Sequence, residues 1–413
     1  MDMQTLQALR RDAEDICRSA IAASVPDAAV RRALAQLPPC AGQTVLISIG
    51  KAGWQTAKAA YDALGSAFQR GVVVTKYGHS QGAIGSFAIY EAGHPVPDEN
   101  SVRATEAALE AVRNLTPADR VLFLVSGGGS ALFEQPLVPL AELEDITGQM
   151  LACGADITRI NTIRKRLSGV KGGRFAQICA PAHVYAILLS DVIGDPPDMI
   201  ASGPAYPDST TSQQALELVQ QYHLNLTPRA LELLGQPLPK ELPNVTTVIT
   251  GSVSQLCRDG AARAEELGYR TCLLTDRLQC EAREAGRFLA AMAASHAGKG
   301  EKTAYIAGGE TVVHLTGHGL GGRNQELALA AAPGLAGLDA ALASVGSDGT
   351  DGPTDAAGGI VDGATASVLE AKGVSIEAVL AENDAYHALK DCGGLIITGP
   401  TGTNVNDIAV LLV

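Results

Sequence analysis

The sequence predicts an α/β protein with two domains, each built as a mostly parallel sheet covered by helices on both faces. Short apolar runs typical of buried strands alternate with helix-type segments in both halves of the chain. Of the 413 residues, 46% are hydrophobic, 45 are glycine and one is tryptophan, a composition that suits many strand–helix turns. Prolines at positions 228, 237, 239 and 243 mark a composition shift, so we place the boundary between domains 1–240 and 241–413.

The N-terminal half begins with a helical stretch at residues 3–37, where apolar residues recur at helical spacing. A helix is also expected over about 101–114, with Asp98 or Ser101 as its N-cap, and residues 140–180 are expected to be mainly helical. The expected strands are 45–49, 72–75, 87–90, 121–125 and 184–189. Residues 196–211 are rich in Pro, Ser and Asp and predict a long functional loop.

The C-terminal half repeats the alternation. The expected helices are at about 253–267, 278–297, 323–332 and 363–371, and the expected strands are 247–250, 271–274, 304–307, 312–315, 342–345 and 395–398. In such folds the ligand binds beyond the carboxyl ends of the strands. Polar or Gly-rich loops follow predicted strands at 50–53, 126–130, 190–195, 346–355 and 398–407, and another, at 317–323, follows a predicted hairpin. We therefore expect the functional residues in these loops.

The composition also indicates which partners and which cellular compartment the chain is compatible with. The net charge of −13 argues against nucleic acid, although an anionic small molecule stays compatible if the site concentrates positive charge. The chain shows no run of about 18 apolar residues and no basic and apolar leader, so we expect no membrane span and no signal peptide. The eight cysteines are scattered without CxxC or zinc spacing, which indicates reduced thiols in a cytoplasmic protein.

The strand 121–125 ends at the sequence Ser126-Gly127-Gly128-Gly129-Ser130, and helix-compatible residues follow. Three glycines leave the backbone N–H groups accessible, and a helix start favours phosphate. One interpretation is therefore a phosphate-binding loop. The alternative is a strand–helix turn that needs glycine for its geometry alone.

Cations occur at two further places. Lys51 follows Gly50 at a strand–helix turn, where its charge opposes the helix dipole, so it either faces an anion or points into solvent. Five cations fall within the eleven residues 164–174, beside the glycine pair at 172 and 173. This run is either a binding site for phosphate or carboxylate or a solvated helix face.

Residues 317–322 form a second glycine loop, which leads through Arg323 into a helix. It is another candidate anion site, with an arginine at its edge, and Glu310 is either a turn residue or a ligand. Carboxylates also gather at predicted strand ends, namely at positions 191, 195, 348, 351, 355 and 407. They suit Mg²⁺ or substrate, and they are equally what ordinary turns contain.

Several common signatures are missing. The chain has no Walker A sequence, no GxGxxG, no GxSxG, no HExxH and no set of protein-kinase motifs. Of the dispersed histidines, only His94 and His318 lie in candidate loops, and each is as well explained by a structural or surface role.

Taken together, the motifs resemble those of class II glycerate kinases, whose C-terminal domain is called MOFRL. The N-terminal motifs that carry the resemblance lie at 50–52, 93–98, 126–132, 164–174, 190–195 and 202–204. The C-terminal ones lie at 309–311, 321–326, 351–358 and 398–407. They follow the family's order from about residue 45 to the end of the chain.

The resemblance implies two three-layer α/β/α domains, a Rossmann-like N-terminal one and a C-terminal one of MOFRL type, with the active site in an interdomain cleft. It also implies phosphorylation of D-glycerate at O2 by ATP with Mg²⁺. Lys51 and Arg323 match the family's catalytic lysine and arginine.

Other site residues are assigned on the same basis. The nucleotide-binding residues are expected to be Ser126, Gly127, Gly128, Gly129, Ser130 and Lys171. The substrate-binding residues are expected to be Arg164, Glu310, Asn324, Asn404 and Asp407, and the metal ligands Asp191 and Asp351.

Alternative functions stay open at this point. Family members have often been labelled hydroxypyruvate reductases, but an NAD(P)H-dependent reductase should carry a dinucleotide fingerprint, which is missing. A module that senses a nucleotide or a sugar acid would bind ATP without consuming it. A kinase for a related acid, such as tartronate or another aldonate, is a further alternative. The sequence does not decide the oligomeric state, with a homodimer among the expectations.

Overall fold

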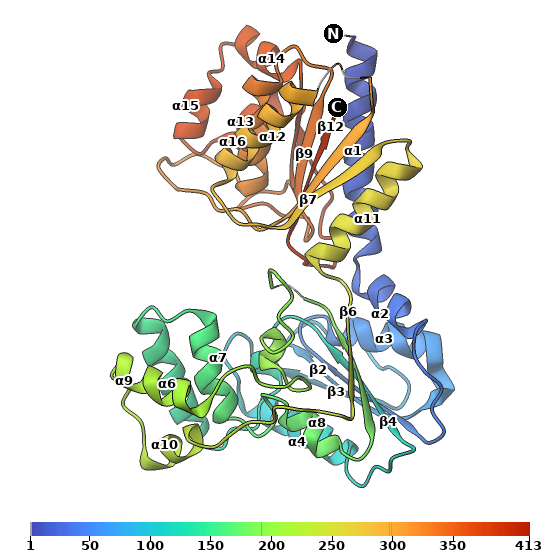
Figure 1. The fold of residues 1–413 in the computed structure, drawn as a ribbon, viewed down its shortest axis with the longest axis vertical. Coiled ribbons are helices and arrows are strands. Elements are labelled where there is room, and N and C mark those ends of the chain that lie inside the picture. The colour runs from blue at the N-terminus through green and yellow to red at the C-terminus, as the bar shows by residue number, and fades with distance from the viewer. Residues whose placement is uncertain (1, 191, 297, 299) are drawn as a thin grey trace. The chain divides into compact units, whose positions relative to one another are not determined.

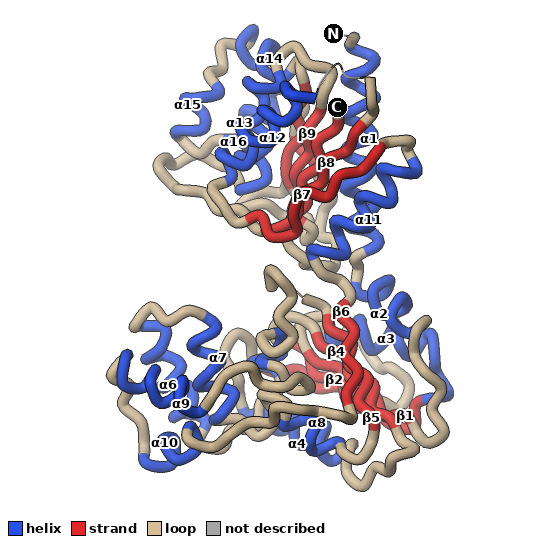
Figure 2. Tube along the Cα trace, in the orientation of Figure 1, coloured by secondary structure: helices blue, strands red, loops and turns tan. Residues whose placement is uncertain are grey.

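A computed structural model describes residues 2–190, 192–296, 298 and 300–413. It contains two compact units, drawn as ribbons in Figure 1 and by secondary structure in Figure 2. Unit 1 is formed by Met1–Ala28 and Gly251–Val413, and unit 2 by Ala29–Thr250. Each unit has a six-stranded sheet with helices on both faces (Figure 1). The predicted α/β fold class is confirmed.

The sheet of unit 2 has the strand order β3-β2-β1-β4-β5-β6, and its paired strands are parallel. Its strands are β1 Thr44–Ile49, β2 Phe68–Lys76, β3 Ala88–Ala92, β4 Arg120–Val125, β5 His183–Leu188 and β6 Val245–Ile249. The chain builds one side of the sheet through β3 and then returns to the centre with β4. Doubly wound sheets bind their ligands at such a reversal, here between β1 and β4.

Helices cover both faces of this sheet because successive side chains of a strand point to opposite sides. Ile47 of β1 packs on the face covered by α4 (Glu99–Ala111) and α8 (Arg174–Cys179). Leu46 packs on the face covered by α2 (Pro26–Leu34) and α3 (Gly53–Leu64). The central strands β1 and β4 are therefore buried along their whole length.

Four further helices of unit 2 share an apolar core of their own and form the group at the left of unit 2 in Figure 1. They are α6 Leu140–Ala152, α7 Ile157–Arg166, α9 Ser212–Gln221 and α10 Pro228–Leu234. Shorter helical segments are η1 Gly65–Ala67, α5 Gly129–Leu132 and η2 Ile200–Ser202. The expected long loop at 196–211 is irregular apart from η2.

The sheet of unit 1 is mixed, with the strand order β11-β10-β9-β12-β8-β7. Its strands are β7 Arg270–Leu278, β8 Thr303–Gly309, β9 Ala341–Gly346, β10 Gly358–Asp362, β11 Leu395–Ile396 and β12 Asp407–Leu412. Among the pairs that the structure describes, only β7 and β8 run parallel. The prediction of a mostly parallel second sheet is therefore wrong. The loop 347–357 returns the chain from β9 to β10, and β12 inserts antiparallel between β8 and β9.

Helices flank this second sheet on both sides (Figure 1). On one face lie α1 Met3–Ala23 and α11 Val253–Glu266. On the other face lie α12 Ala282–His296, α13 Arg323–Leu335, α14 Thr365–Ala371, α15 Ile376–Ala381 and α16 Ala385–Asp391. The predicted strand at 312–315 is wrong, because this segment makes only an isolated bridge between Val312 and Glu281.

The structure divides the chain differently from the predicted boundary between residues 240 and 241. Strand β6 pairs with β5 and completes the sheet of unit 2, so the change of unit falls at Gly251. At the other end of the chain, α1 packs on β9, β12 and α11 of unit 1. Its buried face includes Leu6, Ala13 and Ile16, which need a sheet to cover them.

Two expectations about the compartment can be compared with this fold. No helix in the part of the chain that the structure describes is long and apolar enough to cross a membrane. All eight cysteines are free thiols.

The position of α1 leads to a stability prediction. Ile16 is fully buried in unit 1, so Ile16→Ala should destabilise that unit by about 2–5 kcal/mol through a lost contact and a cavity. The only tryptophan, Trp54, lies in the core of unit 2. In a urea titration, we expect the variant to lose part of its far-ultraviolet circular dichroism at a lower urea concentration than the wild type. The midpoint of the Trp54 emission change should stay the same.

Ile157→Ala is the matched control, because Ile157 is exposed at the start of α7. If Ile16→Ala shifted the midpoint of the Trp54 emission change instead, α1 would contribute to the stability of unit 2 rather than unit 1.

Candidate active site

In unit 2, the carboxyl ends of all six strands lie at one edge of the sheet. The register pairs Ile49 of β1 with Val125 of β4 on one side and with Val74 of β2 on the other. Because all these strands are parallel, the loops that follow them emerge together. Loops 50–53, 126–130 and 190–195, which the sequence singled out, are therefore neighbours, and the segment after β3 joins them.

Two of these loops are tied to each other by hydrogen bonds. The Lys51 amide donates to the Gly127 carbonyl over 2.8 Å, and the Ala52 amide donates to Ser126 Oγ over 3.1 Å. Gly50 has a φ of 114°, and a Cβ there would lie 2.2 Å from Ser126 Oγ. Only glycine permits this approach. The turn that presents Lys51 therefore has its backbone fixed.

Gly128 is the second position where glycine is required. Its φ is 86°, and a Cβ would lie 3.0 Å from His94 Cδ2 and 3.1 Å from Lys51 Cγ. The side chains of Lys51 and His94 thus lie against the glycine loop. To the residues that the structure describes, the amides of Gly127 and Gly128 donate no hydrogen bond. Accessible amides beside a lysine are what an anion needs.

The electrostatics of this edge are positive although the whole chain is acidic. Lys51 is exposed, and no ion pair to its ammonium is found within the described ranges. Burial lowers the pKa of His94, and the charges of Lys51, Lys76 and His79 lower it further. Lys51, Lys76, His79 and His94 therefore form one cluster of basic side chains. Sequence reasoning missed Lys76 and His79, although Lys76 ends β2, the strand next to β1, just as Lys51 follows β1.

The two serines of the loop have structural partners. Ser126 is buried, and its hydroxyl donates to the Ile49 carbonyl over 3.2 Å while it accepts from Ala52. The Ser130 hydroxyl lies 2.9 Å from that of Ser202. The Ser126 hydroxyl proton is therefore not free for a phosphate. The helix that follows, α5, has only four residues.

Lys171, expected to bind nucleotide, is instead fully buried. Its ammonium donates to a Glu134 carboxylate oxygen and to the Phe133 carbonyl over 3.1 Å. Burial lowers the pKa of Lys171 to about 8, against the effect of Glu134. The same Glu134 oxygen lies 3.9 Å from Arg164, whose guanidinium donates to the Ser130 carbonyl over 3.0 Å. Arg164 therefore contacts the glycine loop. The buried Lys171 supports Arg164 through the Glu134 carboxylate that both side chains approach.

The other cations of the run 164–174 are also internal. Lys165 pairs with Asp198 and Asp208, and Arg166 pairs with Asp208. Arg174 donates to backbone carbonyls. This run is therefore neither a solvated helix face nor an open anion site, because its charges are neutralised inside unit 2.

Asp191, the metal ligand predicted at this edge, lies outside the described residues. Asp195 follows in the same loop, and its buried Oδ1 has no hydrogen-bond partner among the described residues. Within the described ranges, no group of three or more His, Cys, Asp or Glu side chains could hold a metal. Mg²⁺ usually takes one or two carboxylates plus phosphate oxygens and water, so a single unpaired carboxylate fits it.

In unit 1, the antiparallel strand β12 brings a second set of predicted residues together. Asp407 begins β12 opposite Gly309, the last residue of β8, and Gly346, the last residue of β9. Glu310 follows β8, and Arg323 begins α13. The mixed topology, which the sequence did not predict, therefore places these three side chains at one edge.

Arg323 is held by two carboxylates. Its Nε and Nη2 donate to Asp407 over 2.6 and 3.0 Å, and its Nη1 donates to Glu310 over 2.9 Å. Burial disfavours the charged form of Arg323, but these partners raise its pKa above the usual value. Burial also raises the pKa of Asp407, to about 6, against the hydrogen bond from Arg323.

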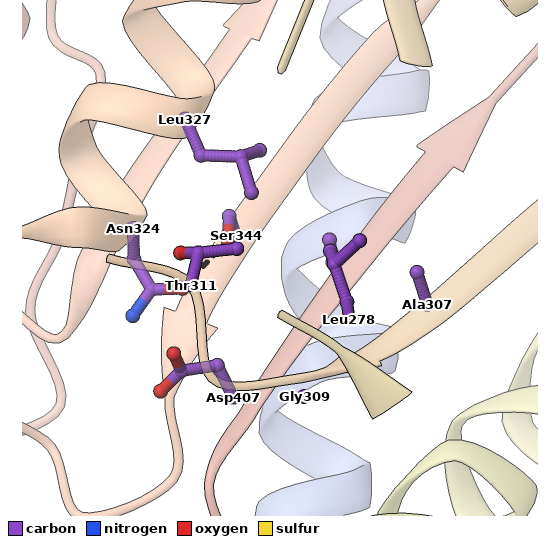
Figure 3. A pocket seen from close by; sticks show the side chains of 9 residues that line it. Leu278, Ala307, Gly309, Thr311, Asn324, Leu327, Ser344 and Asp407 are labelled. Atoms are coloured by element: carbon purple, nitrogen blue, oxygen red, sulfur yellow. Dashed lines mark hydrogen bonds between the residues drawn. The ribbon is translucent and has the colours of Figure 1, made fainter. Parts of the chain in front are cut away.

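A small cavity of about 10 Å³ lies beside Asp407 (Figure 3). Figure 3 shows Leu278 and Ala307 on one side of it and Asn324, Ser344 and Thr311 on the other. Asn324 is buried and accepts from the Ser344 hydroxyl over 2.6 Å. The buried Thr311 hydroxyl has no hydrogen-bond partner among the described residues.

Asp351, a predicted metal ligand, is bonded to the backbone of the chain itself. Its two carboxylate oxygens accept from the amides of Asn324 and Gln325, over 3.1 and 2.9 Å, at the start of α13. The helix start that the sequence predicted as an anion site is therefore already occupied by a carboxylate of the chain itself. Burial raises the pKa of Asp351 despite these hydrogen bonds.

Asn404 is not brought into contact with this cluster. It is exposed, and its side chain accepts from the Asn406 amide over 3.4 Å. Asn406, which the sequence analysis did not select, donates to Glu310 over 3.3 Å. A choice between two asparagines two residues apart depends on side-chain direction, which the sequence alone does not give.

The fold and the site define a two-unit α/β protein with a cationic glycine loop in one unit and a carboxylate-held arginine in the other. Residues 12–235 match the family described as a domain of unknown function, DUF4147, and residues 303–407 match the MOFRL family. The chain belongs to the class II glycerate kinase family, as the resemblance predicted.

Individual relatives agree with this assignment. A D-glycerate 2-kinase of Thermotoga maritima is 50% identical, over 98% of this chain and 99% of the relative. A putative hydroxypyruvate reductase of Agrobacterium vitis is 38% identical, over 100% of this chain and 95% of the relative. The crystal structure of a glycerate kinase from Thermotoga maritima superimposes with a TM-score of 0.93 at 50% identity, covering 98% of this chain and 100% of that one.

The position of Lys171 yields a prediction. Lys171→Met should destabilise unit 2 by about 3–5 kcal/mol, because Glu134 would stay buried without its closest partner. The double variant Lys171→Met/Glu134→Gln should recover much of that loss. Urea unfolding followed by Trp54 emission measures both. A nucleotide-binding role would be supported instead if Lys171→Met kept wild-type stability and lost affinity for ATP.

Proposed function

We propose that this protein transfers the γ-phosphoryl group of ATP to O2 of D-glycerate, giving 2-phosphoglycerate and ADP. The main support for the proposal is the position of the exposed Lys51 beside the glycine loop. The backbone amides of Gly127 and Gly128 in this loop donate no hydrogen bond to the described residues. The names of the relatives point to the same reaction and to glycerate as its acceptor. The free cysteines are consistent with a reducing cytoplasm as its compartment.

The glycine loop of unit 2 binds phosphate oxygens of ATP. The amides of Gly127 and Gly128 donate to them, and the ammonium of Lys51 offsets their charge. Lys76 adds positive potential at the same edge, and the lowered pKa of His94 favours its neutral form there. Phosphoryl transfer depends mainly on positioning and charge stabilisation, which this arrangement supplies.

Arg323 offsets charge on the transferred phosphoryl group. A guanidinium has five N–H donors, and the bonds to Asp407 and Glu310 engage three of them. Two N–H donors therefore remain for substrate oxygens, and the side chain is 34% exposed. Asp407, supported by Asn324, orients Arg323, and Glu310 can also accept a substrate hydroxyl.

Mg²⁺ would be held by Asp195 and by Asp191 of the same loop, together with phosphate oxygens. Its contribution would be to neutralise charge on the phosphates during transfer. Asp351 is left out of this role because both of its oxygens cap α13.

The reaction is tested by incubating the protein with D-glycerate, ATP and Mg²⁺ and measuring ADP release. Enolase added without a mutase accepts only 2-phosphoglycerate, so it distinguishes transfer to O2 from transfer to O3. We expect ADP release and enolase turnover to run in parallel. A panel with tartronate and other aldonates ranks the acceptors.

A reductase would behave differently in a parallel assay. It would oxidise NADH with hydroxypyruvate in the absence of ATP, and a sensing module would bind ATP without releasing ADP. Either result, without glycerate-dependent ADP release, would overturn the proposal.

Lys51→Met tests the role of the lysine. We expect kcat to fall about a hundredfold to a thousandfold, since one preorganised charge would be lost from the transition state. The fold should persist because the side chain is exposed. Lys58→Met on α3 is the control, because Lys58 is exposed and pairs only with Asp62 among the described residues. Near-normal turnover of Lys51→Met would remove this residue from the mechanism.

A further inference from the structure

Three consecutive residues of unit 2 have a left-handed backbone, and two of them are not glycine. The φ angles are 51° at Ala201, 62° at Ser202 and 63° at Gly203. Residues with a Cβ rarely adopt this conformation, and it persists only where the surroundings hold it. Ser202 is fully buried, and Ala201 is nearly so. The proposed catalytic roles do not use this segment, so its contacts have to explain why the chain keeps the conformation.

The segment lies directly against the glycine loop. The methyl group of Ala201 packs on Gly129, where a Cβ would lie only 2.6 Å from it. The Ser202 hydroxyl lies 2.9 Å from the Ser130 hydroxyl. The first half of the loop is tied to the turn of Lys51, and its second half is thus supported by the left-handed segment.

The number of hydroxyl protons gives the direction of these hydrogen bonds. Ser202 has one hydroxyl proton, which it donates to Asn161 Oδ1 over 2.8 Å. Ser130 therefore donates its own proton to the Ser202 oxygen. Asn161 lies on α7 and is buried, so the chain from Ser130 through Ser202 to Asn161 fixes the Ser130 side chain from inside the unit. The Ser130 carbonyl is held separately by Arg164.

The backbone at Ser202 is anchored as well. Its carbonyl accepts from the Gly172 amide over 3.1 Å, and the Gly203 carbonyl accepts from the Gly173 amide over 2.8 Å. Both donors belong to the run 164–174, whose charges are neutralised inside unit 2. The neighbours of the segment therefore impose its left-handed conformation, and strain held in this way is typical of functional sites.

We propose that Ser202 is a positioning residue for phosphoryl transfer, which holds Ser130 and the glycine loop in the geometry that receives the phosphates of ATP. The inference rests on the proposed function, which assigns the phosphates to this loop. Without the Ser202 hydroxyl, Ser130 would lose its acceptor, and the second half of the loop would be free to shift relative to Lys51. Small displacements of donors and charges around a transferred group cost much of the rate.

Ser202→Gly tests this role, because glycine adopts the left-handed backbone without strain while the hydroxyl is lost. The variant should therefore fold, which Trp54 emission in urea checks. We expect kcat for ADP release with D-glycerate to fall about tenfold to a hundredfold. Thr44→Val is the matched control and should keep the wild-type kcat. Thr44 is buried and accepts from Arg120, but it begins β1, at the end of the strand opposite to the site.

A double-mutant cycle with Ser130→Ala separates positioning from a general loss of stability. If Ser202 acts through Ser130, Ser130→Ala should lower kcat by a similar factor. The double variant Ser130→Ala/Ser202→Gly should then be no slower than either single variant. A wild-type kcat in Ser202→Gly would overturn the inference, and so would losses that multiply in the double variant.

Failure of the proposed function would look different. The wild-type protein would then release no ADP with D-glycerate, and the role of Ser202 in that reaction would be refuted with it. An active wild type whose kcat survives Ser202→Gly would refute the positioning role alone.

Discussion

The hydrogen bond from the Lys51 amide to the Gly127 carbonyl is the contact on which the site of unit 2 depends. It joins the two turns that emerge where the strand order reverses, and it forms because Gly50 lets Ser126 come close. With the backbone fixed in this way, the Lys51 side chain and the amides of Gly127 and Gly128 face the same space. The buried chain from Lys171 through Glu134 to Arg164 supports the loop from the other side. Rigid support of this kind lowers the cost of organising charges around a phosphate.

The candidate sites of the two units differ in charge. Unit 2 gathers four cationic or titratable basic groups at one strand edge of an acidic chain, so an incoming anion is attracted. In unit 1 the Arg323 guanidinium is held by Asp407 and Glu310, which raise its pKa and fix its direction. Burial, with a smaller contribution from the charge of Asp351, raises the pKa of Asp407, although its bonds to Arg323 lower it. Arg323 is therefore oriented before any substrate arrives.

The sequence predicted the parallel sheet, the glycine loop and the positions of Lys51 and Arg323, because strand ends and glycine turns are local signals. It did not predict β12 between β8 and β9, since strand direction depends on pairing partners far along the chain. The role of Asp351 as a helix cap was missed for the same reason, because the capped residues are 26 and 27 positions away. The burial of Lys171 was not predicted, because no local pattern in the sequence distinguishes a buried lysine from an exposed one.

The path of the chain also has a consequence for synthesis on the ribosome. Helix α1 is translated before unit 2, but its partners β9 and β12 follow unit 2 in the chain. Unit 2 is encoded without interruption between these parts, so it can fold while α1 still lacks its sheet. Strand β12 lies inside the sheet of unit 1, between β8 and β9. Unit 1 therefore reaches its native pairing only after β12 has left the ribosome, and a chain cut before β12 would leave β8 and β9 without their common neighbour.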